Sequence, residues 1–314
     1  MTNNSHLILL YYLYVPIDNP EALVRRQKRL CERLGLKGRI LIAKEGINGT
    51  VEGVPEACQE YMDTTAKEPG LEKMKFKISP GTGEAFPKLQ VRVRDEIVST
   101  HLDTKYDVGP LTGKTGKYLS AEELHSWIHS DKKFYIVDMR NDYEYAVGHF
   151  QDSVLLEGFA NFRDLPKLLP QIAHLKDETI VTVCTGGVRC EKASGVLLDY
   201  GFNDVYQLED GIVTYMERYP NEDFLGKLYV FDGRLTLAFN EADPAHQVIG
   251  KCAICNAKSE NLVDYYLPDE GGMALEGRHH NIVCRECIGA GKVVLDTDFE
   301  KLTNLKNYRH LQEN

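Results

Sequence analysis

The sequence lacks several features that would assign it to a common class of protein. No uninterrupted apolar run approaches the roughly 18 residues that a membrane-spanning helix needs. The net charge is −10, from 37 Lys and Arg against 47 Asp and Glu, which excludes a generally basic nucleic-acid binder. The glycine fingerprint of a dinucleotide-binding turn is missing, so the sequence shows no flavin or nicotinamide motif. The spacing of histidines and carboxylates also leads us to assign no 2-His-1-carboxylate iron site.

The composition is that of a globular protein with more than one domain. Hydrophobic residues make up 43% of the chain and charged residues 27%, and its 314 residues suffice for two or three domains. The acidic excess lies after residue 110, so a polyanion would meet the N-terminal part with the least repulsion. The apolar stretch from His6 to Pro16 follows no basic segment and precedes no small-residue cleavage site. We therefore expect a first strand there rather than a signal peptide.

Half of the eight cysteines form two Cys-x-x-Cys pairs. Two such pairs, 28 residues apart, can supply four thiolates to a tetrahedral ion, so we expect a structural zinc site. The alternative is four reduced surface thiols. The rest of the cysteine pattern favours a reducing compartment, the cytoplasm, over a disulfide framework. The expected zinc ligands are Cys252, Cys255, Cys284 and Cys287.

The stretch from Ile180 to Ala193 predicts a reactive thiol at the start of a helix. A β-branched run that reads as a buried strand ends at Val183, and Cys184 follows it directly. Unpaired backbone amides and the helix dipole favour an anion at such a position and lower the pKa of a thiol. The alternative is a buried cysteine that merely ends the strand. The expected anion-binding loop consists of Thr185, Gly186, Gly187, Val188 and Arg189.

This loop resembles the six-residue active loop of rhodanese (sulfurtransferase) domains, in which the cysteine carries a persulfide. About forty residues upstream, Asp138 and Arg140 follow a second predicted strand and precede Glu144 and His149, which is similar to the rhodanese signature. Arg189 lies one position closer to the cysteine than in the phosphatases that share this fold. That spacing favours sulfur chemistry over phosphate chemistry.

Residues 1–98 predict a ferredoxin-like α+β domain of order β-α-β-β-α-β. We expect a turn at 46–49, strands at 7–15, 39–43, 50–52, 73–79 and 89–93, and helices at 20–34 and 56–65. The first helix and the segment after the second strand carry basic residues that could contact an RNA backbone, although a solvated helix face is the simpler explanation. These candidate RNA contacts are Arg25, Arg26, Arg29 and Lys44.

The rest of the chain divides into a linker and two further parts. Residues 99–117 are polar and glycine-rich and predict a linker. Residues 118–222 alternate strands with helices, which predicts a rhodanese domain of α/β class with a parallel sheet, including helices at 161–173 and 190–200. Residues 223–314 predict a C-terminal Cys-rich, zinc-binding domain with short strands at 226–231 and 235–239.

Two segments narrow the resemblance to one family. They are Lys44-Glu45-Gly46-Ile47-Asn48-Gly49-Thr50 and the extension Cys190-Glu191-Lys192, which a generic rhodanese loop does not prescribe. With the domain order, they resemble the bacterial oxygen-dependent tRNA uridine(34) hydroxylases, rhodanese-domain proteins that install 5-hydroxyuridine at the wobble position. The resemblance implies an oxidoreductase that acts on tRNA with O2 as co-substrate.

The resemblance also implies roles for individual residues. Cys184 would be the catalytic cysteine, as thiolate or persulfide, with its anion stabilised by the loop amides and by Arg189. Asp138 and Arg140 would brace the loop from the neighbouring strand end. Cys190 is either a thiol that resolves an oxidised Cys184 or a packed thiol on the inner face of the helix.

Two other functions stay open from the sequence alone. One is a rhodanese-type sulfurtransferase that passes persulfide sulfur to a small-molecule or RNA acceptor. The other is a non-enzymatic RNA-binding or scaffold protein. The sequence indicates no oligomeric state.

Overall fold

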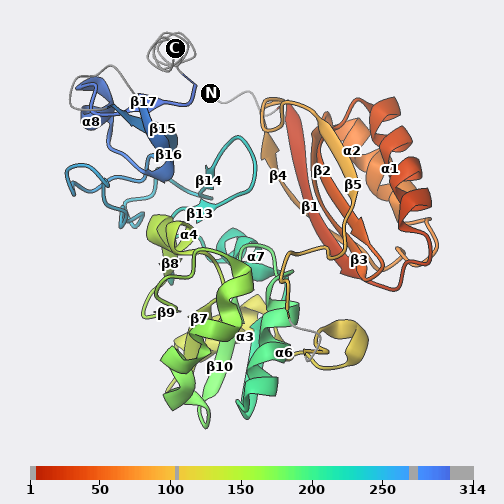
Figure 1. The fold of residues 1–314 in the computed structure, drawn as a ribbon, viewed down its shortest axis with the longest axis horizontal. Helices are drawn as coiled ribbons and strands as arrows, with labels where there is room; N and C mark the ends of the chain where they lie inside the picture. The colour runs from red at the N-terminus through yellow and green to blue at the C-terminus, as the bar shows by residue number, and fades with distance from the viewer. Residues whose placement is uncertain (1–4, 103–105, 269–274, 298–314) are drawn as a thin grey trace, which may run out of the picture.

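The protein is described here from a computed structural model that covers residues 5–102, 106–268 and 275–297 (Figure 1). Residues 103–105 of the expected linker lie outside the described residues, as do residues 1–4 of the first expected domain and 269–274 and 298–314 of the last. The chain forms an N-terminal sheet with two helices, a central parallel sheet with helices, and a small C-terminal sheet.

The N-terminal part is a five-stranded sheet with the order β4-β1-β3-β2-β5. Helices α1 and α2 cover one face of this sheet, and the other face is turned toward the central part (Figure 1). Because side chains alternate along a strand, Ile40 and Ile42 enter the core under the helices, whereas Arg39 and Leu41 belong to the open face. The elements are β1 (His6–Tyr14), α1 (Pro20–Leu34), β2 (Lys37–Ala43), β3 (Gly46–Gly53), α2 (Pro55–Thr65), β4 (Lys75–Gly81) and β5 (Leu89–Val93).

Local signals set the ends of α1, but the expected turn at 46–49 is wrong. The Asn19 side chain accepts a hydrogen bond from the Ala22 amide at the start of α1, and Gly35 ends the helix with a left-handed backbone. Residues 46–49 instead belong to β3. A Cβ atom on Gly46 would lie 2.1 Å from the Leu13 carbonyl oxygen, so this glycine permits close strand approach rather than a turn.

The central part is a five-stranded sheet with the order β6-β11-β10-β7-β9, in which every pair is parallel. The expected helix at 190–200 is confirmed by α6, which follows β10 through the Cys184 loop. The expected helix at 161–173 is wrong, since only one α-helical turn forms between two 3-10 segments. Pro166 and Pro170 lack the amide hydrogen that a continuous helix would use.

The elements of the central part, in chain order, are the following. They are η1 (Pro110–Thr112), β6 (Lys117–Leu119), α3 (Ala121–Ile128), β7 (Tyr135–Asp138), α4 (Asp142–Val147), β8 (Gly148–Phe150), β9 (Val154–Leu155), η2 (Phe162–Asp164), α5 (Leu165–Leu168), η3 (Leu169–Leu175), β10 (Thr179–Val183), α6 (Cys190–Tyr200), β11 (Asp204–Leu208) and α7 (Gly211–Arg218).

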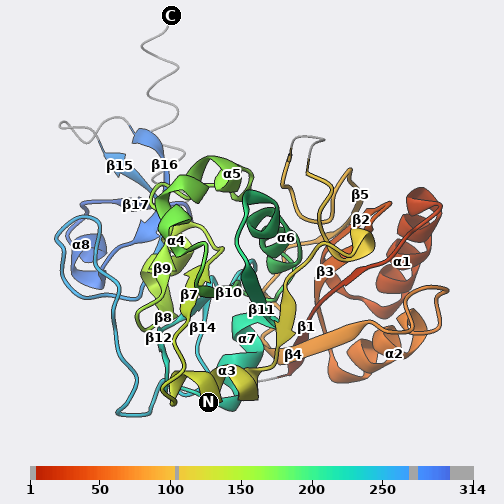
Figure 2. The same ribbon diagram turned by 90° about the horizontal axis from the view of Figure 1, so that it is seen from below.

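The C-terminal part packs against the central part and ends in a three-stranded antiparallel sheet of order β16-β15-β17 (Figure 2). Its first strand pairs with β8, with Leu225 opposite His149. The strands expected at 226–231 and 235–239 are shorter than predicted. The elements are β12 (Phe224–Gly226), β13 (Leu228–Tyr229), β14 (Thr236–Leu237), β15 (Leu262–Pro268), β16 (Leu275–Ile282), α8 (Arg285–Gly289) and β17 (Val294–Leu295).

One lysine of α6 joins the central part to the N-terminal sheet. The Lys192 ammonium group lies 2.8 Å from a Glu45 carboxylate oxygen and 3.0 Å from one of Glu96. The lysine side chain is only 7% exposed, while the two carboxylates are 21% and 23% exposed. The segment before β6 also packs on α6, where the Gly116 amide donates to the Ser194 hydroxyl. Within the described ranges, no helix is long and apolar enough to cross a membrane.

We predict that Lys192→Met destabilises the protein because it leaves two partly buried carboxylates without their cation. Breaking such a pair costs about 3 kcal/mol of unfolding free energy, which thermal or denaturant unfolding would measure. Lys28→Met is the matched control, because Lys28 and Glu32 are 57% and 56% exposed and lie 3.7 Å apart. Equal stability of the two variants would contradict the prediction.

Candidate functional site

The Cys184 loop is held at the carboxyl end of β10 by the start of α7. The Ile212 amide donates to the Cys184 carbonyl and the Val213 amide to the Thr185 carbonyl, each at 3.0 Å. The Gly187 amide turns inward and donates to the Cys184 sulfur at 3.2 Å. The expected geometry of a thiol cradled by backbone amides is therefore present.

The surroundings of Cys184 favour its thiolate. Burial raises the pKa of the Cys184 thiol, but a hydrogen bond from the Cys190 thiol, the charge of Arg189 and nearby backbone amides lower it to about 6. Burial and the adjacent Cys184 raise the pKa of the Cys190 thiol well above its ordinary value. These opposite shifts favour a protonated Cys190 beside an anionic Cys184.

Arg189 forms a buried, bidentate ion pair with Glu144. Arg189 donates to both carboxylate oxygens of Glu144, at 2.6 and 2.9 Å, and neither side chain is more than 8% exposed. Burial raises the pKa of the Glu144 carboxyl, but the ion pair with Arg189 lowers it by more. The net pKa is below its ordinary value, so Glu144 is ionised. This bidentate pair fixes the end of the loop and leaves Arg189 little capacity to bind a second anion.

Asp138 and Arg140 form a second buried ion pair near the loop. The Arg140 guanidinium binds Asp138 and also donates to the Gly148 carbonyl at 2.6 Å. Both side chains are fully buried. The link from this pair toward the loop runs through the backbone, because the Met139 amide donates to the Val183 carbonyl just before Cys184. His149 is stacked on Tyr145 and binds its carbonyl.

The open face of the N-terminal sheet holds the outer side of the loop. Tyr14 donates to the Val188 carbonyl at 3.3 Å, and Lys77 donates to the Gly186 carbonyl at 3.2 Å. Gly187 has a left-handed backbone with φ +97°, and a Cβ atom there would lie 2.8 Å from the Tyr12 hydroxyl oxygen. The glycine is therefore needed both for the turn of the loop and for close contact with the sheet.

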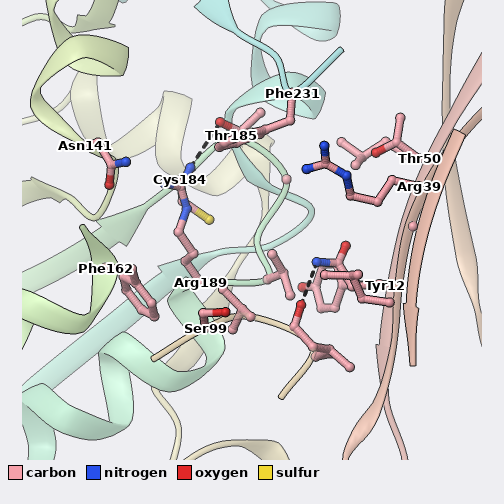
Figure 3. A pocket seen from close by; sticks show the side chains of 18 of the residues that line it. Tyr12, Arg39, Thr50, Ser99, Asn141, Phe162, Cys184, Thr185, Arg189 and Phe231 are labelled. Atoms are coloured by element: carbon pink, nitrogen blue, oxygen red, sulfur yellow. Dashed lines mark hydrogen bonds between the residues drawn. The ribbon is translucent and has the colours of Figure 1, made fainter. Parts of the chain in front are cut away.

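Beside these contacts, a cavity of about 300 Å³ lies between the Cys184 loop and this face of the sheet. In Figure 3, Cys184, Arg189 and Phe162 lie on one side of it, and Tyr12, Thr50 and Arg39 lie on the other. The Arg39 guanidinium projects from β2 toward the cysteine side. The sequence analysis did not identify Tyr12 and Arg39 as residues of a site. It did single out the segment Lys44–Thr50, which contributes Thr50 to this wall of the cavity.

The two family-specific segments meet in the structure. Glu45, from the first segment, binds Lys192, from the second. Glu191 receives hydrogen bonds from Tyr12 of β1 and Tyr118 of β6, and burial raises the pKa of its carboxyl. The extension after the rhodanese loop thus serves contact between the domains.

The predicted RNA-binding arginines lie away from the cavity. α1 covers the opposite face of the N-terminal sheet (Figure 1), and Arg25, Arg26 and Arg29 are exposed on it. Arg26 pairs with Glu68 at 3.0 Å. Lys44 is exposed in the turn between β2 and β3.

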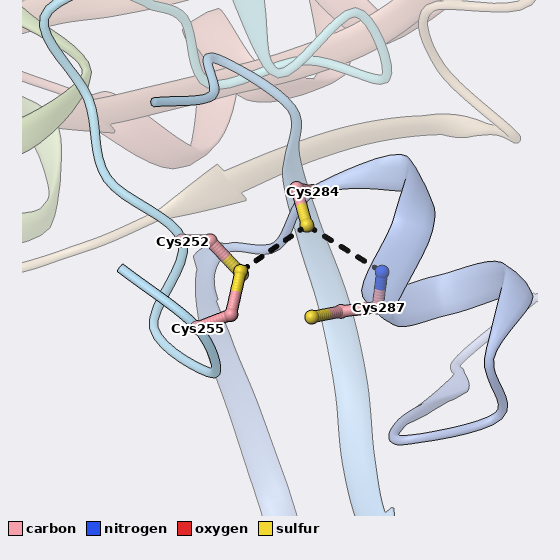
Figure 4. A group of neighbouring side chains, drawn as sticks. All are labelled: Cys252, Cys255, Cys284 and Cys287. Carbon is pink, nitrogen blue, oxygen red and sulfur yellow. Dashed lines mark hydrogen bonds between the residues drawn. The ribbon is translucent and has the colours of Figure 1, made fainter. Parts of the chain in front are cut away.

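The four cysteines of the two Cys-x-x-Cys pairs converge in the C-terminal part (Figure 4). Their sulfur atoms lie within 4.8 Å of one another, and Cys255 and Cys284 are 3.6 Å apart. Around a tetrahedral zinc ion, thiolate sulfurs would be roughly 3.8 Å apart, so this donor set fits a metal ion. The sulfurs are those of Cys252, Cys255, Cys284 and Cys287.

A second group of potential ligands comes from α3, from the residue that follows it, and from the segment after α7. His125 binds Glu222 at 2.8 Å, and His129 binds Asp223 at 3.2 Å. These pairs satisfy the four side chains without an ion.

Comparison with known proteins divides the chain into three matched segments. Residues 6–97 match the UPF0176 acylphosphatase-like domain, 120–218 the rhodanese-like domain, and 225–295 the rhodanese C-terminal segment. A tRNA uridine(34) hydroxylase of Staphylococcus saprophyticus is 39% identical over 98% of this chain and 99% of its own length. Proteins of that name from Cytophaga hutchinsonii and Bacillus licheniformis are 44% and 42% identical, over 83% and 85% of this chain and 81% of their own.

We predict that alkylation of Cys184 by iodoacetamide reaches half its plateau rate near pH 6, because the thiolate is the reactive form and accumulates as the pH rises through its pKa. Mass spectrometry of the peptide that contains Cys184 would measure the rate. In Cys190→Ala the half-point moves to higher pH, because the thiol that donates to Cys184 is removed. A half-point near the ordinary thiol pKa of about 8.5 in the native protein would contradict this.

Proposed function

The chain belongs to the tRNA uridine(34) hydroxylase family, and from that premise we propose how its parts carry out the reaction. It is a tRNA-modifying enzyme that hydroxylates uridine 34, an oxidoreductase with a rhodanese-like cysteine site. The observation that carries this conclusion is the identity of 39% across practically the whole length of both chains in one relative. A match to the rhodanese domain alone would leave sulfur transfer equally favoured.

We propose that Cys184 is the catalytic group and that O2 supplies the oxygen of 5-hydroxyuridine. The lowered pKa of the Cys184 thiol provides an anionic sulfur at neutral pH, either the thiolate itself or, once a persulfide is formed, the terminal sulfur bonded to Cys184. Its neighbours orient and stabilise this anion: the Gly187 amide at the sulfur, and Arg189 fixed by Glu144. Cys190 lies within hydrogen-bond reach of Cys184, and because burial raises the pKa of its thiol we assign it the role of a packed, protonated donor rather than of a resolving thiol.

Positioning of the loop is the role we assign to Asp138 and Arg140. Thr185 and Val188 contribute the loop backbone, and the Thr185 hydroxyl lies 3.4 Å from Glu144. Since Asp138 and Arg140 are fully buried, they act through the ends of β7 and β10 and not on substrate.

Contact with the tRNA backbone is the role we propose for the basic residues of the N-terminal part. A tRNA is much larger than the cavity, so residues outside it can bind phosphates far from the reacting base. Because its substrate is tRNA, we place the protein in the cytoplasm. The backbone contacts proposed are Arg25, Arg26, Arg29 and Lys44.

The decisive experiment is nucleoside mass spectrometry of bulk tRNA from three strains: the wild type, a deletion strain, and the deletion strain carrying Cys184→Ala. We expect 5-hydroxyuridine and its derivatives to disappear in both mutants. A deletion strain carrying Cys31→Ala is the control, because Cys31 lies on the buried face of α1, in a core cluster that does not include the loop. Intact hydroxylation with loss of thiolated nucleosides would instead assign sulfur transfer.

We further propose that the four-cysteine site holds structural zinc. Thiolate ligands suit zinc, and four of them leave no open coordination position, so the ion would stabilise the C-terminal fold and take no part in hydroxylation. Elemental analysis should give about one zinc per chain, and Cys284→Ser should lower both the zinc content and the thermal stability of the full chain. A metal-free preparation of unchanged stability would contradict the proposal.

A further inference from the structure

The cavity in front of Cys184 has the size and the lining of a site for one unstacked nucleobase. Its volume of about 300 Å³ is at the small end of ligand sites, which range from roughly 300 to 1,000 Å³. Phe162 and Phe231 contribute aromatic surface to its walls. Proteins that read single-stranded RNA commonly place splayed bases against aromatic rings and read their edges with polar groups.

Asn48 presents a fixed hydrogen-bond acceptor in this cavity. Its Nδ2 group donates to the Ile97 carbonyl at 2.9 Å, which determines the orientation of the amide. The oxygen of the same amide is then left to accept a hydrogen bond from a ligand. Asn48 lies on β3 directly opposite Leu41 of β2, and both side chains line the cavity.

Arg39 presents a donor beside this acceptor. It is opposite Thr50 in the β2–β3 ladder, which makes it a diagonal neighbour of Asn48 on the same sheet face. Among the residues that the structure describes, no carboxylate pairs with Arg39. Figure 3 shows its guanidinium directed toward the Cys184 side. Arg189, in contrast, is already engaged by Glu144.

We propose that the cavity receives the uracil base of uridine 34, with Asn48 accepting a hydrogen bond from N3–H and Arg39 donating to an adjacent carbonyl oxygen. This inference rests on the proposed function and specifies how the substrate is read. The edge of uracil carries one donor, N3–H, between two acceptors, its carbonyl oxygens. An acceptor and a donor that lie side by side on the protein therefore match two adjacent groups of this edge. Cytosine has no hydrogen on N3, so it could use the same pair only after sliding along its edge, away from the position set for C5.

Binding of an anticodon stem-loop RNA to the full-length protein tests this proposal without turnover. The probes carry uridine, 3-methyluridine or an abasic site at position 34, and fluorescence anisotropy gives their affinities. We expect the native protein to bind the 3-methyluridine and abasic probes roughly tenfold more weakly than the uridine probe, because a buried hydrogen bond is lost.

The variants make the test specific for Asn48 and Arg39. In Asn48→Ala the penalty for N3 methylation should vanish, whereas Thr50→Ser, a control on the same cavity wall, should keep it. Arg39→Gln should weaken binding of the uridine probe but not of the abasic probe. Thermal unfolding of each variant identifies any that fail to fold, and the methylation comparison in the native protein stands without them.

Equal affinity for uridine and abasic probes, or an undiminished methylation penalty in Asn48→Ala, would overturn base reading. If Arg39→Gln weakened both probes equally, Arg39 would bind phosphate and the proposal would fail for that residue. These results are independent of the cellular assay for 5-hydroxyuridine. Hydroxylation with no base reading overturns this inference alone, whereas base reading with no hydroxylation overturns the proposed function.

Discussion

The site depends on the ionic contact between Lys192 of α6 and two carboxylates of the N-terminal part, Glu45 and Glu96. The Cys184 loop lies at the carboxyl end of β10, an edge at which open α/β sheets form a ligand-binding crevice that opens outward. Here the contact holds a second sheet against that opening, and hydrogen bonds to the Gly186 and Val188 carbonyls tie the loop to it. The cavity lies between two sheets that this contact holds face to face. A substitution of Lys192 would therefore alter the surroundings of Cys184 although Lys192 is not part of the Cys184 loop.

The two sides of the cavity supply different properties. The rhodanese side provides a stabilised sulfur anion, and its own cation, Arg189, is paired with Glu144. The sheet side provides polar groups that a substrate can use, with Arg39 as the cation directed toward the cysteine. In the proposed function, the groups that lower the pKa of the Cys184 thiol are therefore distinct from the groups proposed to hold the substrate.

Features set by neighbouring residues could be predicted from the sequence, and features set by distant packing could not. The Cys184 loop, α6 and the two Cys-x-x-Cys pairs are specified by local pattern and spacing, and the family resemblance is confirmed by the relatives. The turn expected at 46–49 was wrong because the glycines of this segment permit close packing against strand β1 and do not form a bend. Arg39 was missed because its place in the cavity wall arises only when the open sheet face meets the loop, and a single arginine in a strand carries no signal of that contact.

Photocrosslinking tests most directly whether position 34 of the RNA lies between the two sheets. A stem-loop RNA with 4-thiouridine at position 34 would be irradiated in complex with the full-length Cys184→Ala protein, and the crosslinked peptides would be sequenced by mass spectrometry. The account predicts crosslinks to the residues that line the cavity, from β2, β3 or the loop after β10. Crosslinks confined to α1 or to the four-cysteine part would contradict it, because the reacting base would then lie outside the cavity that the two domains enclose.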